Sequence, residues 1–367
     1  EQLRRNDGLK LNNMKLKQLT IMAMLASSVA ISAAGNPFLN YKQWKTPHGT
    51  YPFNEICNAH YMPAFEEGIK QGLAEVDAIA NNPAAPTYAN TIEALESAGE
   101  LLSVVAGCFY NLASAETNDS IQAIQVQLSP MMSEYSASIR LNEKLFQRIK
   151  TVYDGRGKLK LNKEQQKLLE DTYESFANNG ANLSPEDKQK YRELSAKLSM
   201  LTMTFGQNVL KATNAWSMLI TREEDLAGLN DDTKAMLKAN AEAKGLNGWL
   251  LNLKATTVTP VLKDCDNRDI RRELYMAYNT RCIGGEFDNT QIIIDIANTR
   301  LELAKLFDKD CYADKSLYKT MAENKENVYR LLDQLRDNYM PAAREEVKEL
   351  KEYAPQQGLY TALQPWD

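Results

Sequence analysis

His48 and His60 are the only two histidines among 367 residues, and imidazole is a common ligand of catalytic zinc. His60 is followed by Tyr61 and His48 by Gly49, so neither histidine opens an H-E-x-x-H zinc helix. Their separation also misses the usual helical spacings of a multi-histidine metal site. The histidines therefore do not indicate a metal centre.

Cysteine chemistry is the next candidate. No two cysteines lie two to four residues apart, which excludes zinc ribbons and thioredoxin-type motifs, and the odd count leaves at least one free thiol. Cys57 and His60 lie one helical turn apart, a spacing that could support Cys–His catalysis, but the sequence offers no orienting partner, so a helix start is the favoured interpretation. We expect the cysteines to pack as small apolar residues, with one disulfide possible in an exported protein. They are Cys57, Cys108, Cys265, Cys282 and Cys311.

The remaining chemistry-bearing motifs are also missing from the sequence. There is no G-x-G-x-x-G, no P-loop and no G-x-S-x-G elbow. We expect adjacent carboxylates to be solvated, as in Glu66-Glu67, Glu223-Glu224 and Glu345-Glu346. We expect the arginines Arg271-Arg272 and Arg281 to pair with nearby groups rather than to bind an anion. The sequence therefore predicts no catalytic, cofactor-binding or metal-binding residue in this chain.

Composition describes an ordinary globular protein. The chain is 44% hydrophobic and 25% charged, and its net charge of −5 gives no basic face for nucleic acid. Its length corresponds to about two domains, or one large one, at roughly 150 residues each.

The first 34 residues read as two segments that lie outside the folded protein. Residues 1–13 form a polar upstream extension, and residues 14–34 have the pattern of a secretory signal peptide. Lys15 and Lys17 precede a short apolar run, and Ser32-Ala33-Ala34 supplies a cleavage site before Gly35. The run is too short for a stable membrane span. We therefore expect an exported, periplasmic protein.

Beyond Asn58, apolar residues recur at helical spacing almost everywhere. Helices are predicted to start at Ser184-Pro185 and at Asn267. The spacing of Asn90 and Glu93 is that of a capping box. The last helix is expected to kink at Pro341. Two strands, Ala215–Ile220 and Trp249–Leu253, flank a helix that ends at Gly245. The fold class is therefore mostly α with a small two-stranded β excursion. The expected helices include residues 62–79, 92–112, 121–135, 145–153, 168–176, 191–209, 270–278, 289–307 and 328–350.

From Asn36 to Asp367, the chain contains an ordered set of distinctive segments. They are Asn36-Pro37-Phe38, Phe53-Asn54-Glu55-Ile56, His60-Tyr61-Met62-Pro63-Ala64-Phe65-Glu66, Ala80-Asn81-Asn82-Pro83, Pro86-Thr87-Tyr88-Ala89-Asn90-Thr91-Ile92, Gly180-Ala181-Asn182-Leu183-Ser184, Arg271-Arg272-Glu273-Leu274, Ile296-Ala297-Asn298-Thr299-Arg300-Leu301-Glu302-Leu303-Ala304 and Leu363-Gln364-Pro365-Trp366-Asp367. In this order the set resembles the M3 zinc metallopeptidases, in particular the peptidyl-dipeptidase (dipeptidyl carboxypeptidase) and oligopeptidase A branch. The segment Leu306-Phe307-Asp308-Lys309-Asp310 departs from the family's usual Leu-Leu-Gly-aromatic turn.

The resemblance implies a multi-helical channel fold of the neurolysin and thimet-oligopeptidase type, with 35–367 as its N-terminal helical part. The family's H-E-x-x-H helix and third glutamate ligand lie beyond Asp367, so one zinc ion is expected in the full-length enzyme and none in this chain. Tyr360 to Asp367 is interpreted as a connection whose aromatic residues lack partners within the chain.

The implied function is an exported zinc peptidyl-dipeptidase that releases C-terminal dipeptides. Its partners would be oligopeptide substrates and its own C-terminal catalytic half, with no nucleic acid. The alternatives are a less selective M3 oligopeptidase and a secreted, non-catalytic α-helical binding protein.

Overall fold

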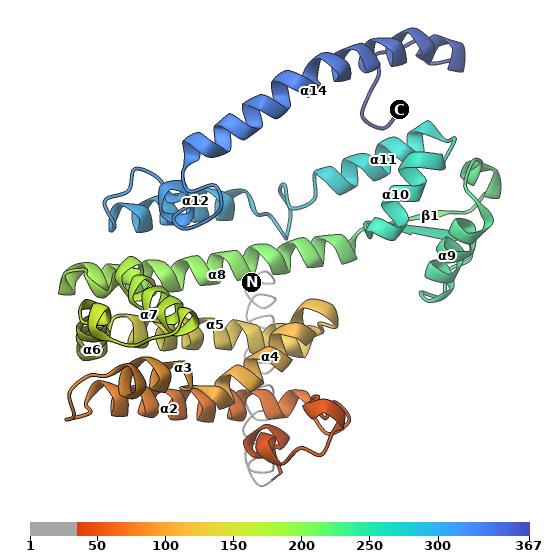
Figure 1. The fold of residues 1–367 in the computed structure, drawn as a ribbon. Helices are drawn as coiled ribbons and strands as arrows, with labels where there is room; N and C mark the ends of the chain where they lie inside the picture. The colour runs from red at the N-terminus through yellow and green to blue at the C-terminus, as the bar shows by residue number, and fades with distance from the viewer. Residues whose placement is uncertain (1–34) are drawn as a thin grey trace, which may run out of the picture. The chain divides into compact units, whose positions relative to one another are not determined.

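The computed structural model describes residues 35–367, and the predicted extension 1–13 and signal peptide 14–34 lie outside the described residues. Within the described range the chain forms thirteen α-helices and one two-stranded sheet (Figure 1). The mostly-α fold class is confirmed. Between residues 35 and 367, no helix combines the length and apolar character needed to cross a membrane.

The described chain divides into two compact units, residues 35–199 and 200–367. The long helix α8 (Pro185–Ala215) contributes residues to both units. It begins as predicted, because the Ser184 hydroxyl accepts a hydrogen bond from the Asp187 N–H at 3.1 Å and Pro185 occupies the first helical position.

The first unit is built around two buried clusters. One packs α2 and α4 against the N-terminal 3₁₀ turn η1 (Pro37–Gln43), with Phe38, Phe65 and Phe109 fully buried. The other gathers apolar residues of α2, α6 and α7 around Ile149 and Leu169. The helices of this unit are α2 (Tyr61–Ala80), α3 (Ala94–Glu96), α4 (Glu100–Ala115), α5 (Asp119–Arg140), α6 (Glu143–Asp154) and α7 (Lys163–Phe176).

The helix expected over 92–112 is interrupted. Its capping box lies three residues earlier than predicted: the Thr87 N–H donates to Asn90 Oδ1 at 2.8 Å and the Asn90 N–H donates to Thr87 Oγ1 at 3.1 Å. A π-helical turn follows (Tyr88–Glu93), and Gly99, at φ 77°, separates α3 from α4. A residue with left-handed backbone angles cannot continue a right-handed helix, so the helix is broken at Gly99. The periodic spacing of apolar residues nevertheless continues across this break.

The second unit contains the two-stranded sheet predicted from the sequence. Strands β1 (Ser217–Ile220) and β2 (Trp249–Asn252) pair antiparallel, with Ser217 opposite Asn252. Leu250 and Leu251 are both buried, because α9 and α10 also pack against β2. The helices of this unit are α9 (Asp231–Glu242), α10 (Ala255–Asp264), α11 (Arg268–Asn279), α12 (Thr290–Lys305), α13 (Tyr312–Ser316) and α14 (Lys325–Tyr353).

Helix α14 is continuous from Lys325 to Tyr353, and Pro341 lies inside it. None of its 29 residues is buried against the described part of the chain. After the 3₁₀ turn η8 (Ala354–Gln357), the chain returns to the start of α11 (Figure 1).

Candidate functional site

The Cys57–His60 pair forms a helix cap. The Cys57 backbone N–H donates to His60 Nδ1 at 3.1 Å, and Cys57 Sγ lies 3.6 Å from the same nitrogen. Because the backbone N–H occupies the Nδ1 lone pair, this nitrogen cannot also accept the thiol proton as a base. Burial lowers the pKa of His60, which further favours the neutral ring. The geometry agrees with the helix-start interpretation.

The described residues do not fit a catalytic zinc. His48 lies in an exposed turn with a left-handed backbone, and His60 is committed to its cap. Between residues 35 and 367, no three His, Cys, Asp or Glu side chains are grouped as metal ligands would be. A catalytic zinc needs three protein ligands around an open position.

All five cysteines are free thiols. Cys108 and Cys265 are buried, and burial raises the pKa of both, so they remain protonated at neutral pH. The Cys108 sulfur lies 3.6 Å from the Tyr61 hydroxyl inside the first unit's core. These two thiols therefore pack as small apolar groups.

Arg271 and Arg281 each contact groups that lie both near to them and far from them along the chain. Arg271 donates to the carbonyl oxygens of Cys265, at 2.5 Å, and Trp366, at 2.7 Å. The Arg281 guanidinium stacks 4.1 Å from the centre of the Tyr278 ring and donates to Thr213 Oγ1 at 3.4 Å.

Acidic pairs behave as solvated surface groups. Glu67 pairs with Lys70, Glu223 with Lys234 and Glu345 with Lys348, all with exposed carboxylates or cations. Hydrogen bonds from Gln71 and Lys70 lower the pKa of Glu67, which favours its charged form rather than that of a general acid.

The prediction that the aromatic residues of 360–367 lack partners is wrong for Trp366. Its ring lies 5.7 Å from that of Tyr275, and Arg268 Nε donates to Asp367 Oδ1 at 2.6 Å. We call Arg268, Arg271 and Tyr275 with Trp366 and Asp367 the tail anchor. Arg268, Arg271 and Tyr275 lie on one face of α11. The hydrogen bonds from Arg271 to Trp366 and from Arg268 to Asp367 join residues 95 and 99 positions apart, and contacts over such separations leave no local signal in the sequence. Tyr360 is 83% exposed, as expected.

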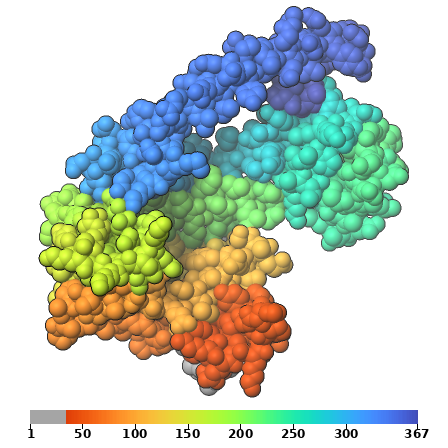
Figure 2. Space-filling view, viewed as in Figure 1, coloured from red at the N-terminus to blue at the C-terminus, as the bar shows by residue number. Residues whose placement is uncertain are grey.

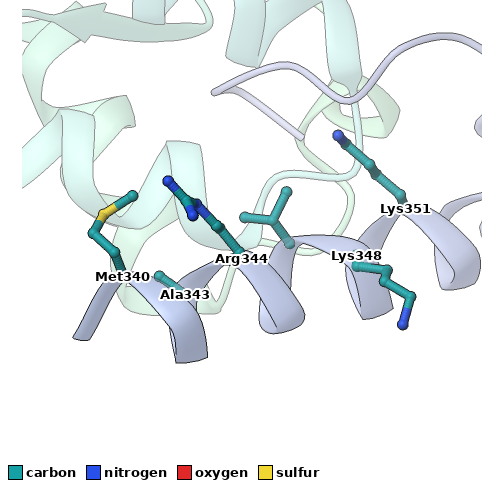
Figure 3. A pocket seen from close by; sticks show the side chains of 6 residues that line it. Met340, Ala343, Arg344, Lys348 and Lys351 are labelled. Carbon is teal, nitrogen blue, oxygen red and sulfur yellow. The ribbon is translucent and has the colours of Figure 1, made fainter. Parts of the chain in front are cut away.

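The feature that sequence reasoning missed is exposed apolar surface in the second unit. A groove of about 360 Å³ on α8 and α12 is lined by Phe205, Ile293 and Ile296 among others. A second depression of about 400 Å³ lies along α14, and Figure 3 shows Met340, Arg344 and Lys351 projecting from the same side of the helix. The surface of α14 is uncovered on the face seen in Figure 2. The strongest candidate in these residues is therefore a binding surface.

Comparison with known proteins identifies the class of protein. Residues 261–367 match the family described as "Peptidase family M3". Oligopeptidase A of Escherichia coli (strain K12) is 32% identical over 327 residues, which cover 88% of this chain and 48% of that protein. Dipeptidyl carboxypeptidase of the same organism is 35% identical over 339 residues, covering 90% of this chain and 49% of that protein.

These matches define a peptidase-related polypeptide. The chain belongs to peptidase family M3, which confirms the resemblance found in the sequence. It spans about half the length of the curated relatives it matches.

Proposed function

We propose that this chain is the N-terminal helical part of an exported zinc peptidyl-dipeptidase that releases dipeptides from the C-terminus of oligopeptides. The observation that carries the proposal is the extent of the match: 90% of the chain aligns with 49% of a dipeptidyl carboxypeptidase. Because residues 35–367 group no metal ligands, the zinc site of the complete protein would lie beyond Asp367.

In this proposal the described helices restrict access and carry no chemistry. They would form one wall of a substrate channel that admits unstructured oligopeptides. Zinc would supply Lewis-acid chemistry to the complete enzyme from ligands outside this chain. The predicted signal peptide at 14–34 supports periplasmic location.

The test uses the complete reading frame. We expect the complete protein to release dipeptides from N-blocked peptides with a free carboxyl end, to spare the same peptides when C-terminally amidated, and to lose activity to a chelator. Cleavage of amidated peptides at internal bonds would favour the less selective oligopeptidase, consistent with the 32% identity to oligopeptidase A. A stop codon directly after Asp367 in intact genomic DNA would instead favour the non-catalytic binding protein.

Two measurements on the chain itself complete the test. Residues 35–367 alone should retain no stoichiometric zinc after mild chelation and hydrolyse no peptide. N-terminal sequencing of periplasmic material should begin at or near Gly35, and a mature protein that still starts at Met14 would contradict export.

A further inference from the structure

Four aromatic rings of α6 and α7 form a continuous stack that ends in an arginine. The Tyr153 and Tyr173 rings are nearly parallel, with their centres 3.9 Å apart. Behind them the Phe146 ring stacks with Tyr173 at 5.8 Å and with Phe176 at 6.4 Å. In front, the Arg156 guanidinium lies 4.0 Å from the centre of the Tyr153 ring. Because Phe146 and Phe176 are buried and Arg156 is exposed, the stack leads from the core to a cation at the surface.

The stack holds the Arg156 guanidinium in one position. Arg156 begins the 3₁₀ turn η5 (Arg156–Lys158), and its Nη1 donates to the carbonyl oxygen of Tyr153 at 2.9 Å. A guanidinium has five N–H donors, so most of those of Arg156 are not used by this contact. A fixed guanidinium with unused donors is pre-organised to bind an oxyanion such as a phosphate.

The loop that follows Arg156 carries three more cations and no carboxylate. We call Arg156, Lys158, Lys160 and Lys163 the basic loop. All four are exposed, and none forms an ion pair within residues 35–367, whereas the flanking Lys150 and Lys167 pair with Asp154 and Asp171. The net charge of −5 for the whole chain therefore conceals a local excess of positive charge.

Local stability does not account for this excess. Lys163 is the first residue of α7, directly after the Asn162 cap, where the helix dipole favours an acidic side chain over a basic one. Long exposed lysines without partners add no packing and no ion pairs to the fold. The cations of the basic loop are therefore better explained by a partner than by folding.

An exposed leucine indicates the kind of partner. Leu159 lies between Lys158 and Lys160 and is 39% exposed, while Leu161 packs against the buried cluster around Ile149 and Leu169. The surface of an anionic bilayer complements this combination, because its phosphates attract cations and its interface accepts an apolar side chain. A nucleic acid would match the charges but would leave the leucine in water.

We infer that the basic loop is a peripheral binding site for the surface of a bilayer that contains anionic phospholipid. Arg156 receives a lipid phosphate, the three lysines add attraction to the surrounding headgroups, and Leu159 enters the interface. The inference goes beyond the proposed function and requires neither zinc nor peptide cleavage.

The experiment is co-sedimentation of the complete protein with lipid vesicles. The protein is used from Gly35 onward, so that the apolar run of the predicted signal peptide cannot bind lipid. We expect binding to vesicles of phosphatidylcholine mixed with phosphatidylglycerol, no binding to phosphatidylcholine alone, and a bound fraction that falls as salt is added. Equal binding to the two compositions, or no binding to either, would overturn the inference. Release by inorganic phosphate at the phosphate concentration of the vesicles, or tighter binding to a DNA oligonucleotide, would also overturn it.

A charge-matched pair of variants tests the location of the site. Replacing the three lysines of the basic loop with glutamine should weaken binding at least about tenfold, because each cation near an anionic surface contributes about fivefold. Replacing three exposed lysines of the second unit removes the same charge and should change binding much less. The substitutions are Lys158→Gln, Lys160→Gln and Lys163→Gln in the loop and Lys238→Gln, Lys244→Gln and Lys254→Gln in the control. Equal losses in the two variants would overturn the assignment to this loop.

Arg156→Lys tests the phosphate contact separately. The substitution keeps the charge but loses the planar donors and the stack on Tyr153, so binding should weaken several-fold. Unchanged binding would overturn the role of the guanidinium.

Peptide cleavage in solution distinguishes this inference from the proposed function. A complete protein that binds anionic vesicles but cleaves no peptide contradicts the proposed function and supports the lipid site. An active peptidase that does not bind these vesicles does the reverse.

Discussion

Arg148 is the only charged residue that is buried as a whole within residues 35–367, with 7% of its surface exposed. Its guanidinium donates to the carbonyl oxygens of Asn82 at 2.8 Å and Ala84 at 3.0 Å, and to Asn90 Oδ1 at 3.0 Å. One arginine on α6 thereby fixes the loop that connects α2 to the Thr87 cap. The sequence predicts the amphipathic helix but not this role, because the Asn90 partner lies 58 residues away.

Replacing Arg148 with Met should lower the free energy of unfolding by about 2 to 4 kcal/mol, because it removes a buried guanidinium and leaves partly buried carbonyl oxygens without their donors. Arg156→Met is the matched control: Arg156 is exposed and stacks on Tyr153, so its loss should cost less than about 1 kcal/mol. Urea denaturation measures both, and equal losses would contradict the anchoring role of Arg148.

The tail anchor should respond to acid. The hydrogen bond from Arg268 lowers the pKa of Asp367 below its ordinary value. A carboxylate stabilised in the folded state contributes stability above the ordinary Asp pKa of about 3.9, and this contribution disappears as the pH falls through the lower folded-state pKa. In this acidic range we expect Trp366 to leave Tyr275, and its fluorotryptophan NMR signal to shift toward the value of a solvent-exposed tryptophan. In the Asp367→Asn variant the shifted signal should already be present at neutral pH. A variant whose signal at neutral pH equals that of the unsubstituted protein would contradict the role of Asp367 in the tail anchor.

At the scale of elements, local chemistry predicts helix starts better than helix interruptions. Asn267 caps α11 through hydrogen bonds from the N–H groups of Asp269 and Ile270, as its sequence position indicates. The interruption at Gly99 depends on contacts from elsewhere, since Glu75 accepts a hydrogen bond from the Gly99 N–H at 2.7 Å. Apolar periodicity alone cannot reveal such a contact.

Gly99→Ala should destabilise the protein by about 1 to 3 kcal/mol, because the residue has φ 77° and an added Cβ would lie 2.9 Å from the Tyr135 hydroxyl oxygen. Gly206 provides the control, since it lies inside α8 and a methyl group added there would meet no atom of another element within 4 Å. Gly206→Ala should raise stability by about 0.5 to 1 kcal/mol. Thermal unfolding compares the two, and a stabilised Gly99→Ala variant would contradict the proposed cause of the interruption.

At the scale of the whole molecule, the sequence predicts that α14 has an apolar face but not what covers it. Periodicity records which side chains are apolar, whereas burial depends on the rest of the protein. Residue types predict that this chain supplies no catalytic residue, whereas its exposed apolar surface becomes visible only with the fold.

Residues 35–367 on their own should bind a hydrophobic dye and self-associate, because several large apolar side chains of α14 lie in solvent. Leu335→Lys should reduce both effects. Gln334→Lys adds the same charge one residue away on the polar face and should change them less. Sedimentation velocity and dye fluorescence provide the comparison, and equal effects of the two substitutions would exclude the apolar face as the cause.

The tail anchor also sets an order of events during synthesis. Arg268 and Asp367 are 99 residues apart, and a ribosome adds about 5 to 20 residues per second, so Arg268 is made about 5 to 20 s before its partner. The first unit, which ends at Ser199, can complete its cores in the nascent chain before this time. During this interval the face of α11 that carries Arg268, Arg271 and Tyr275 has no contact with Trp366 and Asp367. Slow translation between these two positions would prolong that exposed interval without altering a single residue of the finished protein.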